Sequence, residues 1–190
     1  MKTEMLIDSR LQVKKQRDRV DPKDKLKNLT QAKEFIETAH AMGATVVLVE
    51  GTWDLTHSGH TQHIREAAKY ADLVLLRLAS SEYARSYKGN NRPIEPFRTL
   101  VVNELEHVDA IYVDDTVIAP DRIVENAKIL ADLNPDVIAL ETEDDKLLLK
   151  LASTRYARGQ LGSIIQPVVF TIDHYNSTSD IVKKIRTAVD

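Results

Sequence analysis

The chain has 190 residues and a formal net charge of -3, with 43% hydrophobic and 29% charged residues. This length suits a single domain with one sizeable core. The mildly negative charge argues against a nucleic-acid partner, which requires a basic surface, and no apolar run is long enough for a signal peptide or a membrane span. The absence of cysteine excludes disulfides, thiolate metal sites and cysteine nucleophiles, and we expect a cytoplasmic protein.

The first 25 residues mix acidic and basic side chains and end in the turn-like run Asp21-Pro22-Lys23-Asp24. We therefore expect a charged N-terminal extension over residues 1–25 and one domain over residues 26–190. Apolar residues then recur at helical spacing from Leu29 to Ala39, and Gly43 is placed to end that helix. The β-branched run at 45–49 predicts a strand that is buried on both faces.

Helical and strand patterns alternate through the rest of the chain. We expect helices at 64–71, 97–108, 123–133 and 144–158, a terminal helix from about 177, and further strands at 73–76, 110–113, 137–140 and 168–172. Residues 80–96 are predicted to be largely loop with a short helical piece. Strands separated by helices pair in parallel, so the pattern predicts an α/β fold in three layers around a five-stranded parallel sheet.

The segment that leaves the first buried strand, residues 50–60, is the candidate site. Ligands of open parallel sheets bind beyond the carboxyl ends of the strands. A helix begins within this segment, and the backbone N–H groups and dipole of a helix N-terminus favour phosphate. His57 and His60 add side-chain donors, and Gly59 between them permits close approach to the backbone. The two commonest other phosphate-binding glycine motifs do not occur in the sequence.

Two other interpretations apply to these histidines. A histidine at the start of a helix could simply cap the helix or lie at the surface, without any catalytic role. His57, His60 and His63 could also suggest a metal site, but steps of three residues rotate the side chains apart around the helix. We therefore expect no metal bound by the protein itself.

The run Gly51-Thr52-Trp53-Asp54-x-x-His57-x-Gly59-His60 resembles the Gly-x-Phe-Asp-x-x-His-x-Gly-His motif of the cytidylyltransferase-like nucleotidyltransferases, which have a Rossmann-like fold. Two companion segments are similar to those of the family. Lys88-Gly89-Asn90-Asn91-Arg92-Pro93-Ile94 matches a Lys-Gly-x-x-Arg-Pro-Ile loop, with Arg98 opening the next helix. Residues 177–185 match a Ser-Thr-Thr/Ser-x-Ile-Ile-x-x-Ile helix start.

The resemblance implies transfer of a CMP or AMP group from CTP or ATP to a phosphorylated acceptor of the sugar- or polyol-phosphate type. It implies catalytic roles for His57, His60, Lys88 and Arg98, and acceptor binding by Asp54 and Arg92. The nucleotide would be bound by Gly51, Thr52, Trp53, Gly59, Ser177, Thr178 and Ser179. Mg²⁺ would arrive bound to the triphosphate. We also expect a homodimer that binds neither nucleic acid nor a membrane.

The sequence departs from the family at two places. Ala79-Ser80-Ser81 stands where relatives commonly have Asn-Ser-Asp, and Glu141-Thr142-Glu143-Asp144 replaces a run such as Lys-Gly-Gly-Asp. The added carboxylates could bind a cationic acceptor group, or they could cap the following helix, which we favour. These departures motivate an alternative function, a nucleotide-binding or regulatory protein that retains the pocket without catalysis.

Overall fold

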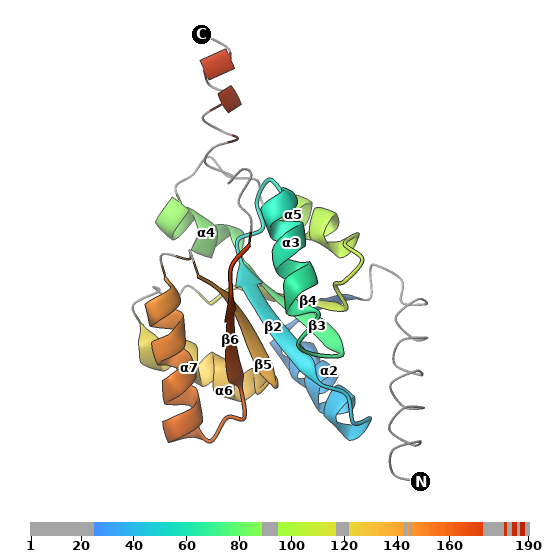
Figure 1. Ribbon diagram of the computed structural model, residues 1–190, viewed down its shortest axis with the longest axis vertical. Helices are drawn as coiled ribbons and strands as arrows, with labels where there is room; N and C mark the ends of the chain where they lie inside the picture. Colours follow the sequence, from blue (N-terminus) through green and yellow to red (C-terminus); the bar gives the residue numbers. More distant parts are fainter. Residues whose placement is uncertain are drawn as a thin grey trace.

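The computed structural model describes residues 25–88, 95–116, 122–142, 144, 146–172, 181, 184–185 and 187–188, with the backbone alone for 87, 88, 95 and 96 (Figure 1). The predicted terminal helix from 177 falls largely outside these residues. The elements are β1 Leu26–Lys27, α2 Leu29–Ala41, β2 Val46–Gly51, α3 Ser58–Ala67, β3 Leu73–Ala79, α4 Ser81–Lys88, α5 Glu95–Asn103, β4 Ala110–Asp114, α6 Ile123–Leu133, β5 Val137–Glu141, α7 Leu147–Leu161 and β6 Gln166–Phe170.

The strands form one parallel sheet in the order β1-β4-β3-β2-β5-β6. The α/β class and the parallel sheet are thus confirmed, but the predicted count of five strands is wrong by one. The additional strand, β1, is only two residues long and pairs Leu26 with Ile111 of β4. So short a segment shows no apolar run or alternation, and only its tertiary pairing identifies it as a strand. Strand order reverses between β2 and β5, which is the topological switch point.

Two findings concern the segment after β3. The stretch at 80–96, predicted to be largely loop with a short helical piece, contains the eight-residue helix α4, which confirms the helical piece. Its start is capped by Ser80, whose Oγ accepts the N–H of Tyr83 at 3.1 Å. The helix predicted at 97–108 ends earlier, at Asn103, and Leu105 and Val108 lie in the turns that follow it. These two residues still pack against the core, which explains the misleading apolar spacing.

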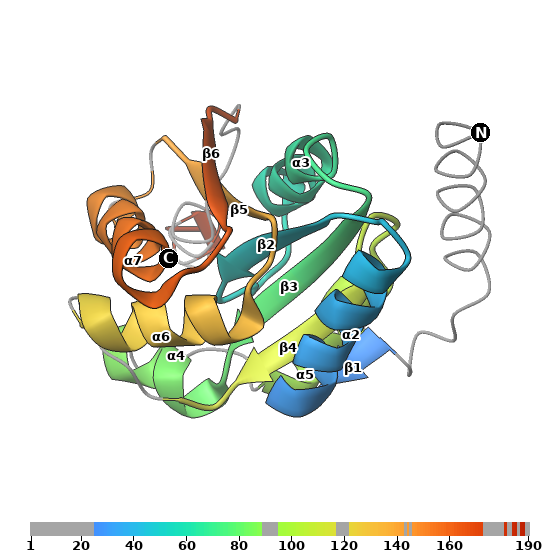
Figure 2. The ribbon, with the colours of Figure 1, turned by 90° about the horizontal axis from the view of Figure 1, so that it is seen from below.

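The core has two parts, one on each face of the sheet. Residues of α2, α6 and α7 pack on one face, and residues of α3 and α5 pack on the other. Figure 2 shows α3 on the side of the strands opposite α2 and α6. This is the three-layer arrangement that the sequence predicted. None of the described helices is both long and apolar enough to cross a membrane.

Helix ends follow their sequence signals. Asn28 and Gln31 form a reciprocal capping box at the start of α2, with bonds of 2.9 and 3.0 Å. Beyond the end of α2, Gly43 has φ of 73°, a left-handed conformation that glycine adopts without strain. Asn134 ends α6 in the same region of backbone space, with φ of 52°.

Aspartates occupy the amino ends of the strands. Asp72 and Asp136 accept the N–H groups of Thr45 and Val46 at 3.0 and 2.8 Å. Asp109 likewise accepts the N–H of Val74 at 2.8 Å. These carboxylates are used to hold the sheet together, which leaves its opposite, carboxyl end for the candidate site.

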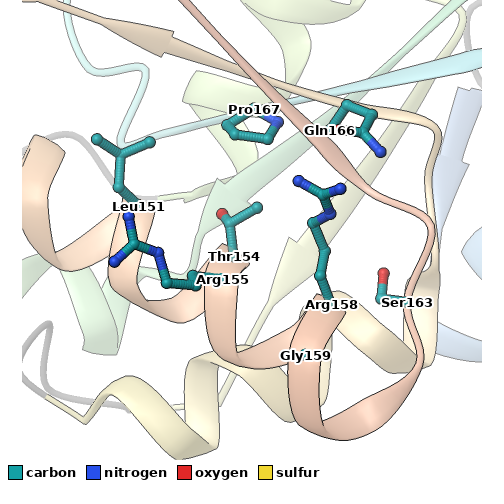
Figure 3. Close-up of a pocket in the computed structure, with 8 residues that line it drawn as sticks. All are labelled: Leu151, Thr154, Arg155, Arg158, Gly159, Ser163, Gln166 and Pro167. Atoms are coloured by element: carbon teal, nitrogen blue, oxygen red, sulfur yellow. The ribbon is translucent and has the colours of Figure 1, made fainter.

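A separate cavity of about 560 Å³ lies on the flank of the sheet between α7 and β6 (Figure 3). Its lining residues are Leu151, Thr154, Arg155, Arg158, Gly159, Ser163, Gln166 and Pro167.

Candidate nucleotide site

The loop between β2 and α3 turns sharply around a buried tryptophan. Trp53 and Leu55 have φ angles of 57° and 42°, a left-handed region that costs side-chain-bearing residues energy. Trp53 is only 2% exposed, and its ring centroid lies 4.9 Å from that of His60. The aromatic residue of the motif is therefore buried, and it packs directly against one of the two motif histidines.

Gly51 makes room for that tryptophan. A Cβ at Gly51 would lie 3.0 Å from Trp53 Nε1 and 3.1 Å from its Cε2. These distances are tighter than nine in ten real Cβ contacts, so a side chain here would require the indole to shift by a few tenths of an ångström. The first glycine of the motif is thus explained by packing within the loop.

His57 and His60 cap the start of α3 through a reciprocal pair of hydrogen bonds. The N–H of Gly59 donates to His57 Nδ1 at 3.2 Å, and the N–H of His57 donates to His60 Nδ1 at 3.3 Å. The ring centroids lie 3.9 Å apart. Because each Nδ1 accepts a hydrogen bond, each neutral ring carries its proton on Nε2.

This pairing changes the sequence-based account of the helix start. We expected the first backbone N–H groups of α3 to be available to a ligand, but those of His57 and Gly59 are used by the two imidazoles. The two histidines therefore do cap the helix, each through its Nδ1 atom. This capping is compatible with a role in phosphate binding, since it leaves Nε2–H as the donor of each ring.

Arg98 of α5 contacts the backbone of the loop. It is 2% exposed, and its Nη1 donates to the carbonyl oxygen of Thr52. Thr52, Asp54 and Gly59 are also buried, Asp54 to 1% exposure. The structure thus brings seven predicted site residues together at one strand-to-helix turn: Gly51, Thr52, Trp53, Asp54, His57, Gly59 and His60, with Arg98 beneath them. Two roles stay predictions: that Arg98 contacts phosphate, and that Asp54 contacts the acceptor.

The other predicted site residues are not placed. Arg92, Ser177, Thr178 and Ser179 lie outside the described residues. Lys88 is the last residue of α4, and its side chain is likewise outside the described part of the chain. Their roles stay predictions.

His63 faces the end of β5 across the switch point. It lies one turn beyond His60 on α3, and its Nδ1 is 3.8 Å from Glu141 Oε2. Its ring meets Phe170 of β6 edge-on at 5.2 Å. His63 therefore turns toward β5 and β6, while His57 and His60 stack on each other. Within the described residues, no three His, Cys, Asp or Glu side chains form a group that could hold a metal ion.

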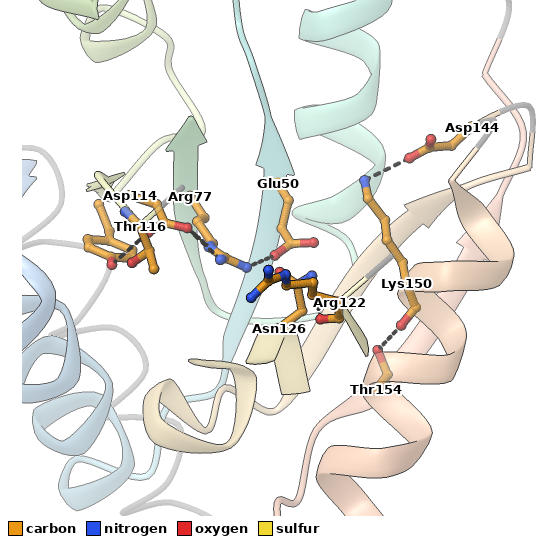
Figure 4. Close-up of polar contacts among 10 residues, drawn as sticks. Glu50, Arg77, Asp114, Thr116, Arg122, Asn126, Asp144, Lys150 and Thr154 are labelled. Carbon is orange, nitrogen blue, oxygen red and sulfur yellow. Dashed lines mark hydrogen bonds and ion pairs between the residues drawn. The ribbon is translucent and has the colours of Figure 1, made fainter. Parts of the chain in front are cut away.

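Asp144 contacts residues at the start of α7 but does not cap that helix, whose N-cap residue, Lys146, has no side-chain cap hydrogen bond. Asp144 Oδ1 accepts the N–H of Lys146 at 2.9 Å, just before α7, and its Oδ2 accepts Lys150 Nζ at 2.7 Å. Figure 4 shows this pair and the bond from Thr154 to the carbonyl of Lys150. Asp144 is therefore used by the helix that follows it.

A buried charge cluster at the carboxyl ends of β2, β3 and β4 was missed by the sequence analysis. Arg77 lies between Glu50 and Asp114, with Nη1 2.5 Å from Glu50 Oε1 and Nε 2.9 Å from Asp114 Oδ2 (Figure 4). Tyr112 donates to Asp114 Oδ1 at 3.3 Å, and the N–H of Thr116 donates to the same oxygen at 3.0 Å. One signal was present in the sequence, a charged residue inside the apolar run of β3.

The electrostatics of this cluster are strongly coupled. Burial alone would lower the pKa of Arg77, but the charges of Glu50 and Asp114 outweigh it and raise that pKa. The pKa of Tyr112 is raised by burial first and by the charge of Asp114 second. The cluster ties together the strand ends that lead into the Gly51 and Ser80 turns, and Ser80 itself donates its N–H to the carbonyl of Asp114 at 3.0 Å.

Comparison with known proteins agrees with the motif and its geometry. The cytidylyltransferase-like family model matches residues 48–184. The bifunctional protein HldE of Salmonella arizonae is 29% identical over 161 residues, which cover 83% of this chain and 31% of that protein. HldE of Geobacter metallireducens is 34% identical over 112 residues, which cover 57% of this chain and 22% of that protein. The chain thus spans about a third of the length of the first of these relatives.

Solved structures share the fold. A lipopolysaccharide core biosynthesis protein from Thermoplasma volcanium has a TM-score of 0.55 at 24% identity, over 70% of this chain and 100% of that one. Pantothenate synthetase from Thermus thermophilus has a TM-score of 0.57 at 13% identity, over 84% of this chain and 70% of that one. At these identities the likeness concerns the fold alone. The motif, the strand-to-helix turn that presents it and the match over residues 48–184 lead to one conclusion: the chain belongs to the cytidylyltransferase-like family.

Proposed function

We propose that this protein is a nucleotidyltransferase that transfers a CMP or AMP group to a phosphorylated small molecule. One observation carries the proposal: His57 and His60 both commit Nδ1 to the backbone at the N-terminus of α3. The same loop follows β2, beside the point where strand order reverses, which is where open parallel sheets bind ligands.

The proposed reaction needs no covalent enzyme intermediate. An oxygen of the acceptor phosphate attacks the α-phosphorus of the nucleoside triphosphate and forms a new P–O bond. The bond from that phosphorus to the oxygen bridging the α- and β-phosphates breaks, and its electrons leave with pyrophosphate. Negative charge therefore shifts among the phosphate oxygens, and the protein's task is to hold the groups in line and stabilise that charge.

The histidine pair suits this task. Nε2–H donors that are fixed in advance need not reorganise when charge develops on the α-phosphate. The positive end of the α3 dipole acts in the same direction. Trp53, wedged against His60, and Arg98, bonded to the Thr52 carbonyl, keep the loop in this shape. Preorganised donors of this kind commonly contribute a factor of about 10² to 10³ in turnover.

We further propose that the triphosphate arrives with Mg²⁺, which neutralises charge on the β- and γ-phosphates. The similarity to HldE, together with the motif, supports an acceptor of the sugar- or polyol-phosphate type. A cytoplasmic location and a homodimer complete the proposal. The cysteine-free composition supports the first, and light scattering on the purified chain tests the second.

The test is pyrophosphate release. The full chain is incubated with Mg²⁺ and either CTP or ATP, with and without glycerol 3-phosphate or a sugar 1-phosphate. We expect release that requires both a nucleotide and a phosphorylated acceptor, and that fails with the unphosphorylated polyol or sugar. Tight nucleotide binding by calorimetry without release across the panel would instead identify a non-catalytic nucleotide-binding protein.

A further inference from the structure

The cavity between α7 and β6 is remote from the motif loop and has a chemistry of its own. It is lined by residues from the second half of α7 and from the amino end of β6, whereas the motif follows the carboxyl end of β2. Its volume of about 560 Å³ falls in the range of roughly 300–1,000 Å³ that is usual for small-molecule sites.

Two arginines give the cavity positive charge. Arg155 and Arg158 are three residues apart on α7 and therefore neighbours on its surface, where like charges repel. Neither guanidinium forms an ion pair with an acidic side chain in the described part of the chain. Figure 3 shows Arg158 extending toward Gln166 and Pro167, Arg155 lying beside Leu151, and Thr154 between them. A bound anion would relieve the repulsion and satisfy both guanidinium groups.

The other polar groups in the lining are disposed to accept hydrogen bonds. Thr154 is 1% exposed and donates its hydroxyl hydrogen to the carbonyl of Lys150 at 2.8 Å. Ser163 bonds to Asn134 Oδ1 at 2.9 Å in the same way. With its hydrogen used within the protein, Ser163 Oγ can only accept; it accepts the N–H of Ile165 at 3.2 Å and keeps one lone pair for a ligand, and Gln166 Oε1 can accept as well. Groups that accept in this way match hydroxyls on the ligand.

Gly159 keeps the cavity open. It lies inside α7, where glycine weakens a helix relative to alanine. A Cβ at this position would meet nothing within 4 Å, so packing against protein does not require glycine. The dipole of α7 accounts for a basic residue in the last turn, such as Arg158, but not for Arg155 or for the glycine beside the cavity.

We propose that this cavity binds a phosphate monoester of a small polyol. The proposal rests on the arginine pair, on the accepting oxygens and on the space beside Gly159. The phosphate is held by Arg155 and Arg158, and the ligand hydroxyls donate to Ser163 and Gln166. This second site is separate from the nucleotide site and does not depend on the proposed transfer reaction.

The probe is glycerol 3-phosphate, titrated into the full chain by calorimetry and thermal unfolding at constant ionic strength, with glycerol and inorganic phosphate for comparison. The wild type should bind the ester, and glycerol should have no effect. The double variant Arg155→Gln/Arg158→Gln should weaken binding at least tenfold. Gly159→Leu, which fills the cavity while favouring the helix, should do the same without lowering the melting temperature.

Two further variants locate the binding. Arg65→Gln removes an exposed arginine from α3, on the other face of the sheet, and should bind the ester like the wild type. His60→Gln alters the motif loop and should also retain the binding at this cavity. No binding by the wild type, unchanged binding by the double arginine variant, or a loss confined to His60→Gln would each overturn the proposal. Equal affinity for inorganic phosphate would overturn the part of it that concerns the polyol.

Discussion

His60 has a structural and a proposed chemical role, and substitution can separate them. Its Nδ1 caps the backbone of His57, so His60→Ala should lower the free energy of unfolding by about 1 kcal/mol through the lost cap. The same change should lower kcat/KM for nucleotidyl transfer by a factor of about 10² to 10³, because a donor to the α-phosphate is removed. Urea denaturation and pyrophosphate release measure the two effects.

The matched control is His60→Gln. Glutamine at the third helical position can supply the same cap, as Gln31 does for Asn28 in α2 at 3.0 Å. We expect this variant to regain stability while turnover stays low. Recovery of turnover together with stability would show that His60 acts only as a cap.

A methyl group at Gly51 is expected to press against the indole of Trp53. In Gly51→Ala, the new Cβ would meet the indole of Trp53, and such overpacking typically costs about 1–3 kcal/mol. Trp53 is the one tryptophan of the sequence, so its fluorescence reports directly on the loop and should shift. Gly159→Ala is the control: nothing lies near its Cβ, and the helix should gain about 0.5–1 kcal/mol. Unchanged fluorescence and stability in Gly51→Ala would contradict this packing.

At the residue scale, the sequence predicted which side chains of the motif meet at the strand-to-helix turn but not how they contact one another. The spacing of His57, Gly59 and His60 indicated a helix start that suits phosphate. The left-handed backbone of Trp53 and the Nδ1 bonds of the two histidines depend on coordinates of the folded loop. A residue such as Arg98, 46 positions from Thr52, has no local signal for its bond to that carbonyl.

Among the elements, the cluster of Glu50, Arg77 and Asp114 fastens three strands together. Arg77→Met would leave two buried carboxylates without their cation, and breaking a buried pair in this way typically costs about 3–5 kcal/mol. Replacing all three by Gln, Met and Asn should recover most of that loss, because no charge is then left unpaired. Chemical denaturation of both variants is the measurement. A loss below about 1 kcal/mol in Arg77→Met, as for exposed pairs, would contradict the account.

The raised pKa of Tyr112 predicts that the free energy of unfolding falls at alkaline pH. Burial and the charge of Asp114 raise the pKa of Tyr112 in the folded state above its ordinary value of about 10. The folded protein therefore retains the phenol proton at a pH where the unfolded chain loses it. This contribution to stability is complete below about pH 10 and is lost as the pH rises toward the folded pKa. The free energy of unfolding should fall more steeply above about pH 10 in the wild type than in Tyr112→Phe. If the free energy of unfolding fell equally with pH in the wild type and in Tyr112→Phe, this role of Tyr112 would be contradicted.

Element prediction succeeded where apolar patterning was long and failed where tertiary contact decides. The strands β2 to β5 appear in the sequence as apolar runs, and Gly43 and Asn134 mark helix ends. The two-residue β1 exists through its pairing with β4. The charge cluster joins residues 27 and 37 positions apart along the chain, a separation that no local pattern encodes.

For the whole molecule, the two ends of the sheet have different tasks. Aspartates at the amino end hold the strands, and the loops at the carboxyl end carry the motif. The fold class followed from the alternation of strands and helices, and the position of the site followed from the motif that leaves β2. The identity of the proposed acceptor did not follow, because the motif residues are assigned to the nucleotide phosphates and Arg92, proposed to bind the acceptor, lies outside the described residues.

The most direct test of the account is the identity of the phosphorus that is attacked. The full chain is incubated with Mg²⁺, CTP or ATP and an acceptor whose phosphate is labelled with oxygen-18, and the products are analysed by mass spectrometry. Nucleotidyl transfer predicts unlabelled pyrophosphate and a nucleotidyl acceptor that keeps all of the acceptor's labelled phosphate oxygens, with both products greatly reduced in His60→Gln. Formation of a nucleoside diphosphate with a doubly phosphorylated acceptor, or equal product from His60→Gln, would contradict it.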